Sequence, residues 1–241
     1  MASNKLLFPL LMAKVKFEIN VYYGKLSIPQ IAIDTNNILK TSPVLIDGDK
    51  IFKTGFSAYW HICEKYHPEL LIENTEYLDW AIWSEQLYGP LSSLHNMHVY
   101  GHQIRSFGRF KSRLETLNTL LENKEYLIND KLSMIDLMIF SFFWQIKESE
   151  QYEKIWNFDE PLAEFENQII TLNQYTNIDI WYSKISKNFQ REIDIIKNKM
   201  PWAHEGFVDK FPMDVKVVKH KDSHEDDMRN ERFTLEIGPE L

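Results

Sequence analysis

The strongest structural signal in the chain is the stretch Tyr126-Leu127-Ile128-Asn129-Asp130-Lys131-Leu132-Ser133-Met134-Ile135-Asp136-Leu137. Its S-x-x-D pair, Ser133 and Asp136, stands at the start of the most apolar segment of the sequence, residues 134–146. A serine hydroxyl can accept a hydrogen bond from an unpaired amide at a helix start, and the carboxylate returns one and complements the helix dipole. The pattern therefore predicts a capped helix at the centre of a core.

Apolar residues around this box recur at helical spacing, so nearly everything after residue 75 is predicted to be helical. The segments with this spacing are residues 75–88, 104–121, 134–146, 152–156, 161–173 and 178–199. The aromatic cluster of Phe140, Phe142, Phe143 and Trp144 is interpreted as core.

The chain before residue 53 is strand-like. Val15–Tyr23 and Ser27–Ile33 are rich in β-branched and aromatic residues. Pro43-Val44-Leu45-Ile46 leads into Asp47-Gly48-Asp49, a hairpin turn signal, and Lys50-Ile51-Phe52 reads as the return strand. A helix over Phe56–Tyr66 follows and ends at Pro68.

Composition changes again after residue 200. Residues 201–241 hold ten acids and six bases, half of the net charge of −8. A mobile tail and an arm that lies on this domain or on a partner are both open readings. The aromatics Trp202, Phe207, Phe211 and Phe233 favour an arm bound to a partner subunit. The acids Glu225-Asp226-Asp227 read as a solvated charge run rather than a cation site.

The overall composition narrows the class of protein. The chain of 241 residues has a negative net charge and contains no dense Lys/Arg cluster. Both features argue against a nucleic-acid partner. The single cysteine, Cys63, excludes an intrachain disulfide and favours an intracellular protein of the cytoplasm or mitochondrion over a secreted one. No apolar run approaches the roughly 20 residues that cross a bilayer, so no transmembrane segment is predicted.

Three features together resemble the glutathione-transferase family over residues 5–198. They are the hairpin at Pro43, similar to that family's P-V-L-x-D-G, the helix Phe56–Tyr66 directly after it, and the box at Ser133 and Asp136. The stretch Tyr175-Thr176-Asn177-Ile178 with Trp181 is also similar to the family's Y-P-N-l-x-x-W, with Thr176 where proline is usual. The resemblance implies a thioredoxin-like half over residues 1–72, in which Pro43 opens a strand. It also implies a helical half over residues 73–200, followed by an extended tail over residues 201–241.

The same resemblance exposes two departures at the site where the family binds glutathione. The family's enzymes place a Tyr, Ser or Cys just after the first strand. If Lys5–Phe8 is that strand, Pro9–Ala13 offers none; if Val15–Tyr22 is the strand, Tyr22 and Tyr23 are candidates. The family's acid–Ser pair is replaced by Thr54-Gly55-Phe56, in which a phenyl ring cannot make the serine's hydrogen bonds.

These losses imply a non-catalytic branch, without a cofactor. Two such branches are the appended domains of aminoacyl-tRNA synthetases and elongation factor 1 subunits, and the metaxin group of the mitochondrial outer membrane. The expected function is an adaptor that joins other protein subunits through its tail and helical half. The alternative is a divergent glutathione transferase or peroxidase that uses Tyr22 or Tyr23.

Other reactive residues are assigned structural roles. His95, His98 and His102 lie three and four residues apart, a spacing that could hold a metal ion, but no carboxylate or thiol accompanies them. Cys63 lies on an apolar stripe and is interpreted as a buried, inert thiol. Asp79 and Glu85 read as charges on a solvated helix face. No metal site is predicted.

Overall fold

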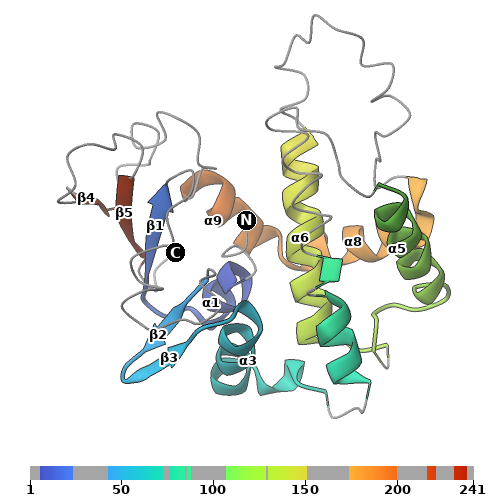
Figure 1. Ribbon diagram of the computed structural model, residues 1–241, viewed down its shortest axis with the longest axis horizontal. Coiled ribbons are helices and arrows are strands. Elements are labelled where there is room, and N and C mark those ends of the chain that lie inside the picture. Colours follow the sequence, from blue (N-terminus) through green and yellow to red (C-terminus); the bar gives the residue numbers. More distant parts are fainter. Residues whose placement is uncertain are drawn as a thin grey trace, which may run out of the picture. The chain divides into compact units, whose positions relative to one another are not determined.

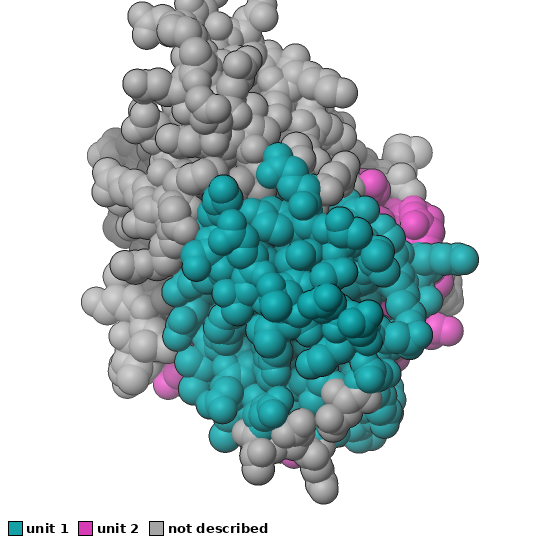
Figure 2. Space-filling view, turned by 90° about the vertical axis from the view of Figure 1, so that its right-hand side faces the viewer, with its two compact units in different colours: residues 1–5, 68–188 teal, residues 6–67, 189–241 magenta. Residues whose placement is uncertain are grey.

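A computed structural model describes residues 6–23, 43–72, 76–84, 86–87, 107–128, 130–150, 174–199, 216–220 and 231–237. The chain forms two compact units, which are described separately (Figures 1 and 2). Unit 1 comprises residues 1–5 and 68–188, and unit 2 comprises residues 6–67 and 189–241. Residues 189–241 fall in the same unit as residues 6–67.

Unit 1 is helical in its described part. It begins with the short 3-10 helix η2 (Pro68–Leu70) and helical residues 77–84 and 86–87, followed by α5 (Phe107–Leu120), α6 (Met134–Glu150) and α8 (Thr176–Asn188). Helix α8 packs on both α5 and α6. The predicted aromatic core is confirmed: Phe140, Phe142, Phe143 and Trp144 are all buried.

The predicted cap box at the start of α6 is confirmed. The hydroxyl of Ser133 donates to Oδ2 of Asp136 at 2.6 Å and accepts from the amide of Asp136 at 3.3 Å. The amide of Ser133 donates to the same oxygen at 3.0 Å. The other oxygen, Oδ1, accepts from the amide of Leu127 and from Nε1 of Trp181 in α8, both at 2.9 Å. Asp136 therefore joins the turn before α6, the start of α6 and α8.

Burial raises the pKa of the Asp136 carboxyl, and the hydrogen bonds from Ser133, Leu127 and Trp181 oppose that rise. Both oxygens of this fully buried side chain accept two hydrogen bonds each. The four donors stabilise this carboxylate. We therefore assign the pair of Ser133 and Asp136 a structural role, which is to hold the start of α6 in place, and not a role in a reaction.

The start of α8 is capped by a side chain of another helix, α5. Oδ1 of Asn118 in α5 accepts from the amides of Asn177 and Ile178, in the first turn of α8, at 2.9 and 3.3 Å. Nδ2 of Asn177 donates to the carbonyl of Asn118 at 2.8 Å. The first amides of a helix lack partners within it, so Asn118 supplies from α5 what a local cap residue would supply.

Unit 2 begins with a helix. Helix α1 (Leu7–Ala13) packs on α3 (Gly55–Tyr66) and on α9 (Gln190–Lys199). Nε2 of His67, the residue that ends α3, donates to the carbonyl of Pro9 at 2.9 Å. A first strand over Lys5–Phe8 is therefore wrong: Leu, Met and Ala favour helix there, and Pro9 lies in the first turn, where proline is tolerated.

The predicted hairpin is confirmed. Strands β2 (Leu45–Asp47) and β3 (Lys50–Phe52) pair antiparallel around a turn in which Gly48 has φ of 62°. Glycine suits this left-handed position at the first residue of a two-residue turn. The opposed pair Ile46 and Ile51 is 51% and 43% exposed. Pro43, just before β2, is buried.

The second sheet of unit 2 joins the two ends of the chain. Strand β1 (Phe17–Tyr23) pairs antiparallel with β5 (Glu231–Ile237), which pairs antiparallel with β4 (Lys216–His220), so the order is β1-β5-β4 (Figure 1). Strand β1 lies within the predicted strand over Val15–Tyr23. The acidic tail, expected to be ordered only on other surface, contributes two strands that pair within its own unit.

Two further differences concern the helices. The segment predicted as one helix over residues 178–199 forms α8 and α9, which meet at the buried Phe189 without a glycine or proline. The segments predicted over Ser27–Ile33, 152–156 and 161–173 lie outside the described residues. No helix in the described ranges has the length and hydropathy needed to cross a membrane.

Candidate functional site

The N-terminus of α3 is the site at which the resemblance places glutathione ligands. Thr54 is its N-cap: Oγ1 accepts from the amide of Ser57 at 3.1 Å, and Oγ of Ser57 accepts from the amide of Thr54 at 3.4 Å. The two hydroxyls also bond each other at 2.8 Å, and that of Ser57 contacts the carbonyl of Thr54 at 3.1 Å. This capping box engages both hydroxyls within the protein.

The side chains of the two residues between Thr54 and Ser57 carry no polar group that could bind a ligand. Gly55 carries no side chain. The half-buried ring of Phe56 lies 6.0 Å from that of Trp60, tilted by 49°. The residue before Thr54 is Lys53, so no carboxylate stands in residues 53–57. The helix start is therefore well capped and lacks an acid that could pair with an amino group.

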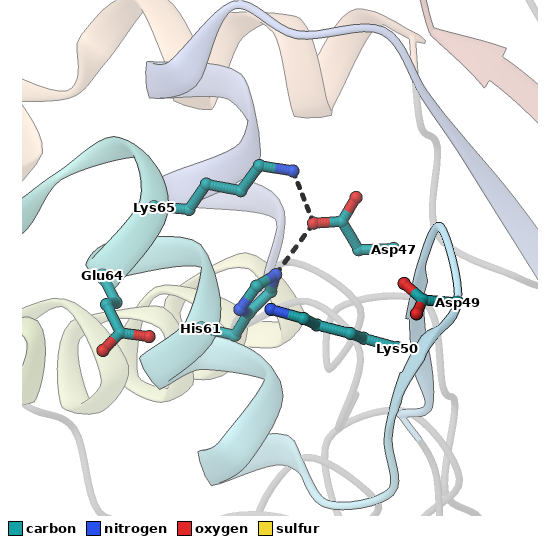
Figure 3. A pocket seen from close by; sticks show the side chains of 6 residues that line it. All are labelled: Asp47, Asp49, Lys50, His61, Glu64 and Lys65. Carbon is teal, nitrogen blue, oxygen red and sulfur yellow. Dashed lines mark hydrogen bonds and ion pairs between the residues drawn. The ribbon is translucent and has the colours of Figure 1, made fainter.

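A charged pocket lies farther along α3, where the β2–β3 hairpin meets the helix (Figure 3). It has a volume of about 440 Å³ and is lined by Asp47, Asp49, Lys50, His61, Glu64 and Lys65. Oδ2 of Asp47 accepts from Nε2 of His61 at 2.8 Å and from Nζ of Lys65 at 2.6 Å. His61 and Lys65 stand four residues apart on α3, so both reach the one carboxylate at the end of β2.

The environment of the pocket shifts two of its pKa values. The hydrogen bonds from Lys65 and then His61 hold the pKa of Asp47 below its ordinary value of 3.8. The same bond to Asp47 raises the pKa of Lys65 above 10.5. The ring of His61 stacks on that of Phe52 at 4.1 Å, which fixes its orientation toward Asp47.

The lining determines what this pocket can do. It contains carboxylates, ammonium groups and an imidazole, but no hydroxyl or thiol that could act as a nucleophile. Asp47 already binds His61 and Lys65, so the arrangement fastens the hairpin to α3. Sequence reasoning missed this cluster. Its signal was the spacing of His61 and Lys65 beside a hairpin whose first strand ends in Asp47.

The other predicted site residues are scattered. Tyr22 and Tyr23 end β1, and Phe233 lies in β5 opposite Val21. Cys63 is completely buried and Asp79 is exposed. Several candidates lie outside the described residues: His95, His98, His102, Glu85, Trp202, Phe207, Phe211 and the acids 225–227. Within the ranges that the structure covers, no cluster of three or more His, Cys, Asp or Glu could hold a metal ion.

Comparison with known proteins identifies the fold. No protein-family model matches the sequence, and no curated protein is detectably similar to it. Among solved structures, glutathione S-transferase III in its apo form is 17% identical, with a TM-score of 0.57, and the match covers 84% of this chain and 94% of that one.

Two further solved structures agree. Glutathione S-transferase-I bound with lactoylglutathione is 20% identical with a TM-score of 0.55, covering 80% of this chain and 94% of that one. Glutathione S-transferase 1-6 from Anopheles dirus species B is 13% identical with a TM-score of 0.56, covering 87% and 93%. The predicted fold, a thioredoxin-like half followed by a helical half, is confirmed.

Proposed function

We propose that this chain, whose fold is that of the glutathione transferases, is a non-catalytic subunit or adaptor of a larger protein complex. The complex is intracellular, in the mitochondrion or cytoplasm, and the chain joins other protein subunits without a cofactor. The proposed counterparts, which share such losses, are the metaxin group and the appended domains of synthetases and elongation factor 1.

The start of α3 supports this proposal most directly. The hydroxyls of Thr54 and Ser57 bond each other and the helix backbone, and Phe56 offers no polar atom. Glutathione bound there would leave both of its charged ends without the acid–Ser pair. Each lost hydrogen bond to a charged group costs about 1.5–3 kcal/mol, so two lost bonds weaken binding by roughly two to four decades.

Exposed apolar side chains on both units could contact the partners of an adaptor. In unit 2, Ile46 and Ile51 lie opposite each other on the hairpin and are about half exposed. In unit 1, Leu78 and Ile82 are one helical turn apart and are 62% and 61% exposed. Clustered exposed aliphatic groups are typical of surfaces that meet a partner protein.

Residues 201–241 give the adaptor proposal less support than their aromatic content indicates. Phe233 belongs to a strand that pairs with β1, so it is already ordered on its own unit. Trp202, Phe207 and Phe211 remain the proposed partner-binding aromatics of this segment.

The decisive experiment is purification of the native protein from its source without a tag. We expect it to migrate in a discrete complex larger than its own 28.8 kDa and to pass through a glutathione resin. Recovery only as a free protein that the resin retains would contradict the adaptor.

One observation favours the enzyme as a second candidate. In the described part of the chain β1 is the first strand, and Tyr22 and Tyr23 end it, where the family places its catalytic hydroxyl. Turnover of a chlorodinitrobenzene-type substrate that is lost in Tyr22→Phe or Tyr23→Phe would establish this candidate. No turnover above the uncatalysed rate would exclude it for this substrate class.

A further inference from the structure

The turn of the β2–β3 hairpin contains the one Asp-Gly step of the chain, Asp47-Gly48, and the sequence has no Asn-Gly step. An Asp-Gly step can rearrange by itself, because glycine has no side chain that shields its amide nitrogen from the preceding carboxyl group. The strand ladder ends at the pair of Asp47 and Lys50, so the amide of Gly48 lies in the turn, outside the paired strands. This nitrogen is the nucleophile of the rearrangement.

The space around Gly48 is open. The residue is exposed, and nothing lies within 4 Å of the place where a side chain at this position would begin. The side chain of Asp47 is 34% exposed, so water reaches its carboxyl group. Neither crowding at the nitrogen nor exclusion of water therefore prevents the rearrangement.

The carboxyl group of Asp47, by contrast, is held in place. Its Oδ2 accepts from Nζ of Lys65 at 2.6 Å and from Nε2 of His61 at 2.8 Å. Figure 3 shows the side chain of Asp47 pointing to these two residues of α3. The ring of His61 is itself stacked on that of Phe52. Turning Cγ of Asp47 toward the nitrogen of Gly48 moves Oδ2 away from both donors.

The same two bonds keep this carboxyl group ionised. Lys65 and then His61 hold the pKa of Asp47 below its ordinary 3.8. An amide nitrogen attacks the protonated acid, which can lose water, and not the carboxylate, whose negative charge repels a nucleophile. Lys65 and His61 therefore oppose the rearrangement both through the position of the carboxyl group and through its charge.

We propose that Asp47-Gly48 is a modification site at which isoaspartate forms, and that Lys65 and His61 hold this reaction back in the folded chain. The nitrogen of Gly48 bonds to Cγ of Asp47 and gives up its proton, and one water leaves with a carboxyl oxygen. Water then adds to either carbonyl of the resulting succinimide ring. The opening restores aspartate or leaves isoaspartate, in which the main chain runs through Cγ. Water is the only other reactant.

Isoaspartate changes the whole hairpin. The main chain gains a methylene group between β2 and the turn, which disturbs the pairing of Asp47 with Lys50. The free carboxylate is then attached at Cα, so the bonds to Lys65 and His61 are lost. The reaction therefore releases the hairpin from α3. This inference is independent of the proposed adaptor function.

The test measures uptake of heavy oxygen from labelled water at residue 47 of the full chain, kept folded at neutral pH. Each succinimide that opens retains an oxygen atom of the solvent, which peptide mass spectrometry locates. Electron-transfer fragmentation separates isoaspartate from aspartate. We expect Lys65→Gln to raise the uptake about two- to fivefold, the range for an ion pair in which Lys65 is 43% exposed. Lys65→Gln combined with His61→Gln raises it further.

Three control variants separate this reaction from other causes. Glu64→Gln changes a residue that lines the same pocket without bonding Asp47, and it should not raise the uptake. Asn118→Ala destabilises the protein through the cap of α8 in unit 1, and it should react like the wild type. Gly48→Asn keeps a residue that tolerates the left-handed turn and should lower the uptake, because its side chain shields the nitrogen.

Equal uptake in the wild type and in Lys65→Gln would overturn the proposal, and so would no uptake at residue 47 in that variant. A rise in Asn118→Ala as large as that in Lys65→Gln would also overturn it, because the reaction would then follow global unfolding. If circular dichroism shows that Lys65→Gln is not folded, His61→Gln provides the same comparison by removing the other donor.

Discussion

At the scale of single residues, the buried carboxylate of Asp136 organises more of unit 1 than a local cap would. It accepts hydrogen bonds from the turn before α6, from Ser133 and from Trp181 of α8. The sequence pattern indicates the pair with Ser133, but the bond to Trp181 spans 45 residues and follows only from the packing of two helices.

The substitution Asp136→Asn tests this network. The new amide nitrogen would be a donor that faces other donors, so we expect a loss of about 2–4 kcal/mol in the free energy of unfolding. Ser133→Ala should lose only about 1 kcal/mol, the ordinary value of a cap. Urea denaturation measures both, with the exposed Glu122→Gln as control. An Asp136→Asn variant as stable as the wild type would refute the network.

The second prediction for a single residue concerns the stability of the protein at low pH. The pKa of Asp47 is lower in the folded protein than its ordinary 3.8, so its contribution to stability is present above that value and is lost as pH falls through the folded pKa. The difference in stability between the wild type and Asp47→Asn should therefore be fully present just above pH 3.8 and shrink as the pH falls further.

Lys65→Gln is the matched variant for this measurement, because Lys65 is the largest cause of the Asp47 shift. It should lose the same acid-dependent contribution. Acid titration curves for the wild type and both variants that run parallel down to about pH 2 would contradict the assignment.

At the scale of elements, α8 depends on a cap that comes from α5. We expect Asn118→Ala to destabilise the protein by about 1 kcal/mol, because the amides of Asn177 and Ile178 lose their acceptor. Asn118→Asp keeps an acceptor at the positive end of α8 and should remain within about 0.5 kcal/mol of the wild type. Thermal melts that give the two variants equal stability would show that Asn118 does not act as a cap.

Sequence patterns predicted those helices and strands that are determined by neighbouring residues in the chain. The hairpin at Gly48 and α3 follow from a turn signal and from apolar spacing, and the start of α6 follows from its cap residues. The pairing of β5 with β1 brings together segments from opposite ends of the chain, and no local pattern identifies the partner. The break between α8 and α9 likewise carries no glycine or proline that could mark it.

The candidate site was predictable in one part only. The sequence Thr54-Gly55-Phe56 predicts the loss of ligands at the start of α3, but the bond between the hydroxyls of Thr54 and Ser57 required the structure. The pocket around Asp47 depends on how a hairpin packs on a helix, which neither local sequence determines by itself.

At the scale of the whole molecule, the division into two units places α9 with α1 and α3 rather than with α8. Hydrogen exchange in the Asp136→Asn variant tests this. We expect α8 amides to lose protection, because the variant damages unit 1, while α9 amides keep the protection of α1. Equal losses in α8 and α9 would contradict the division.

The central claim is that this fold is retained without its glutathione site. Isothermal titration of glutathione into the full chain at neutral pH measures that claim most directly. The capped hydroxyls of Thr54 and Ser57 and the absence of a carboxylate in residues 53–57 predict a dissociation constant above about 1 mM. A saturable signal with a submillimolar dissociation constant would contradict it.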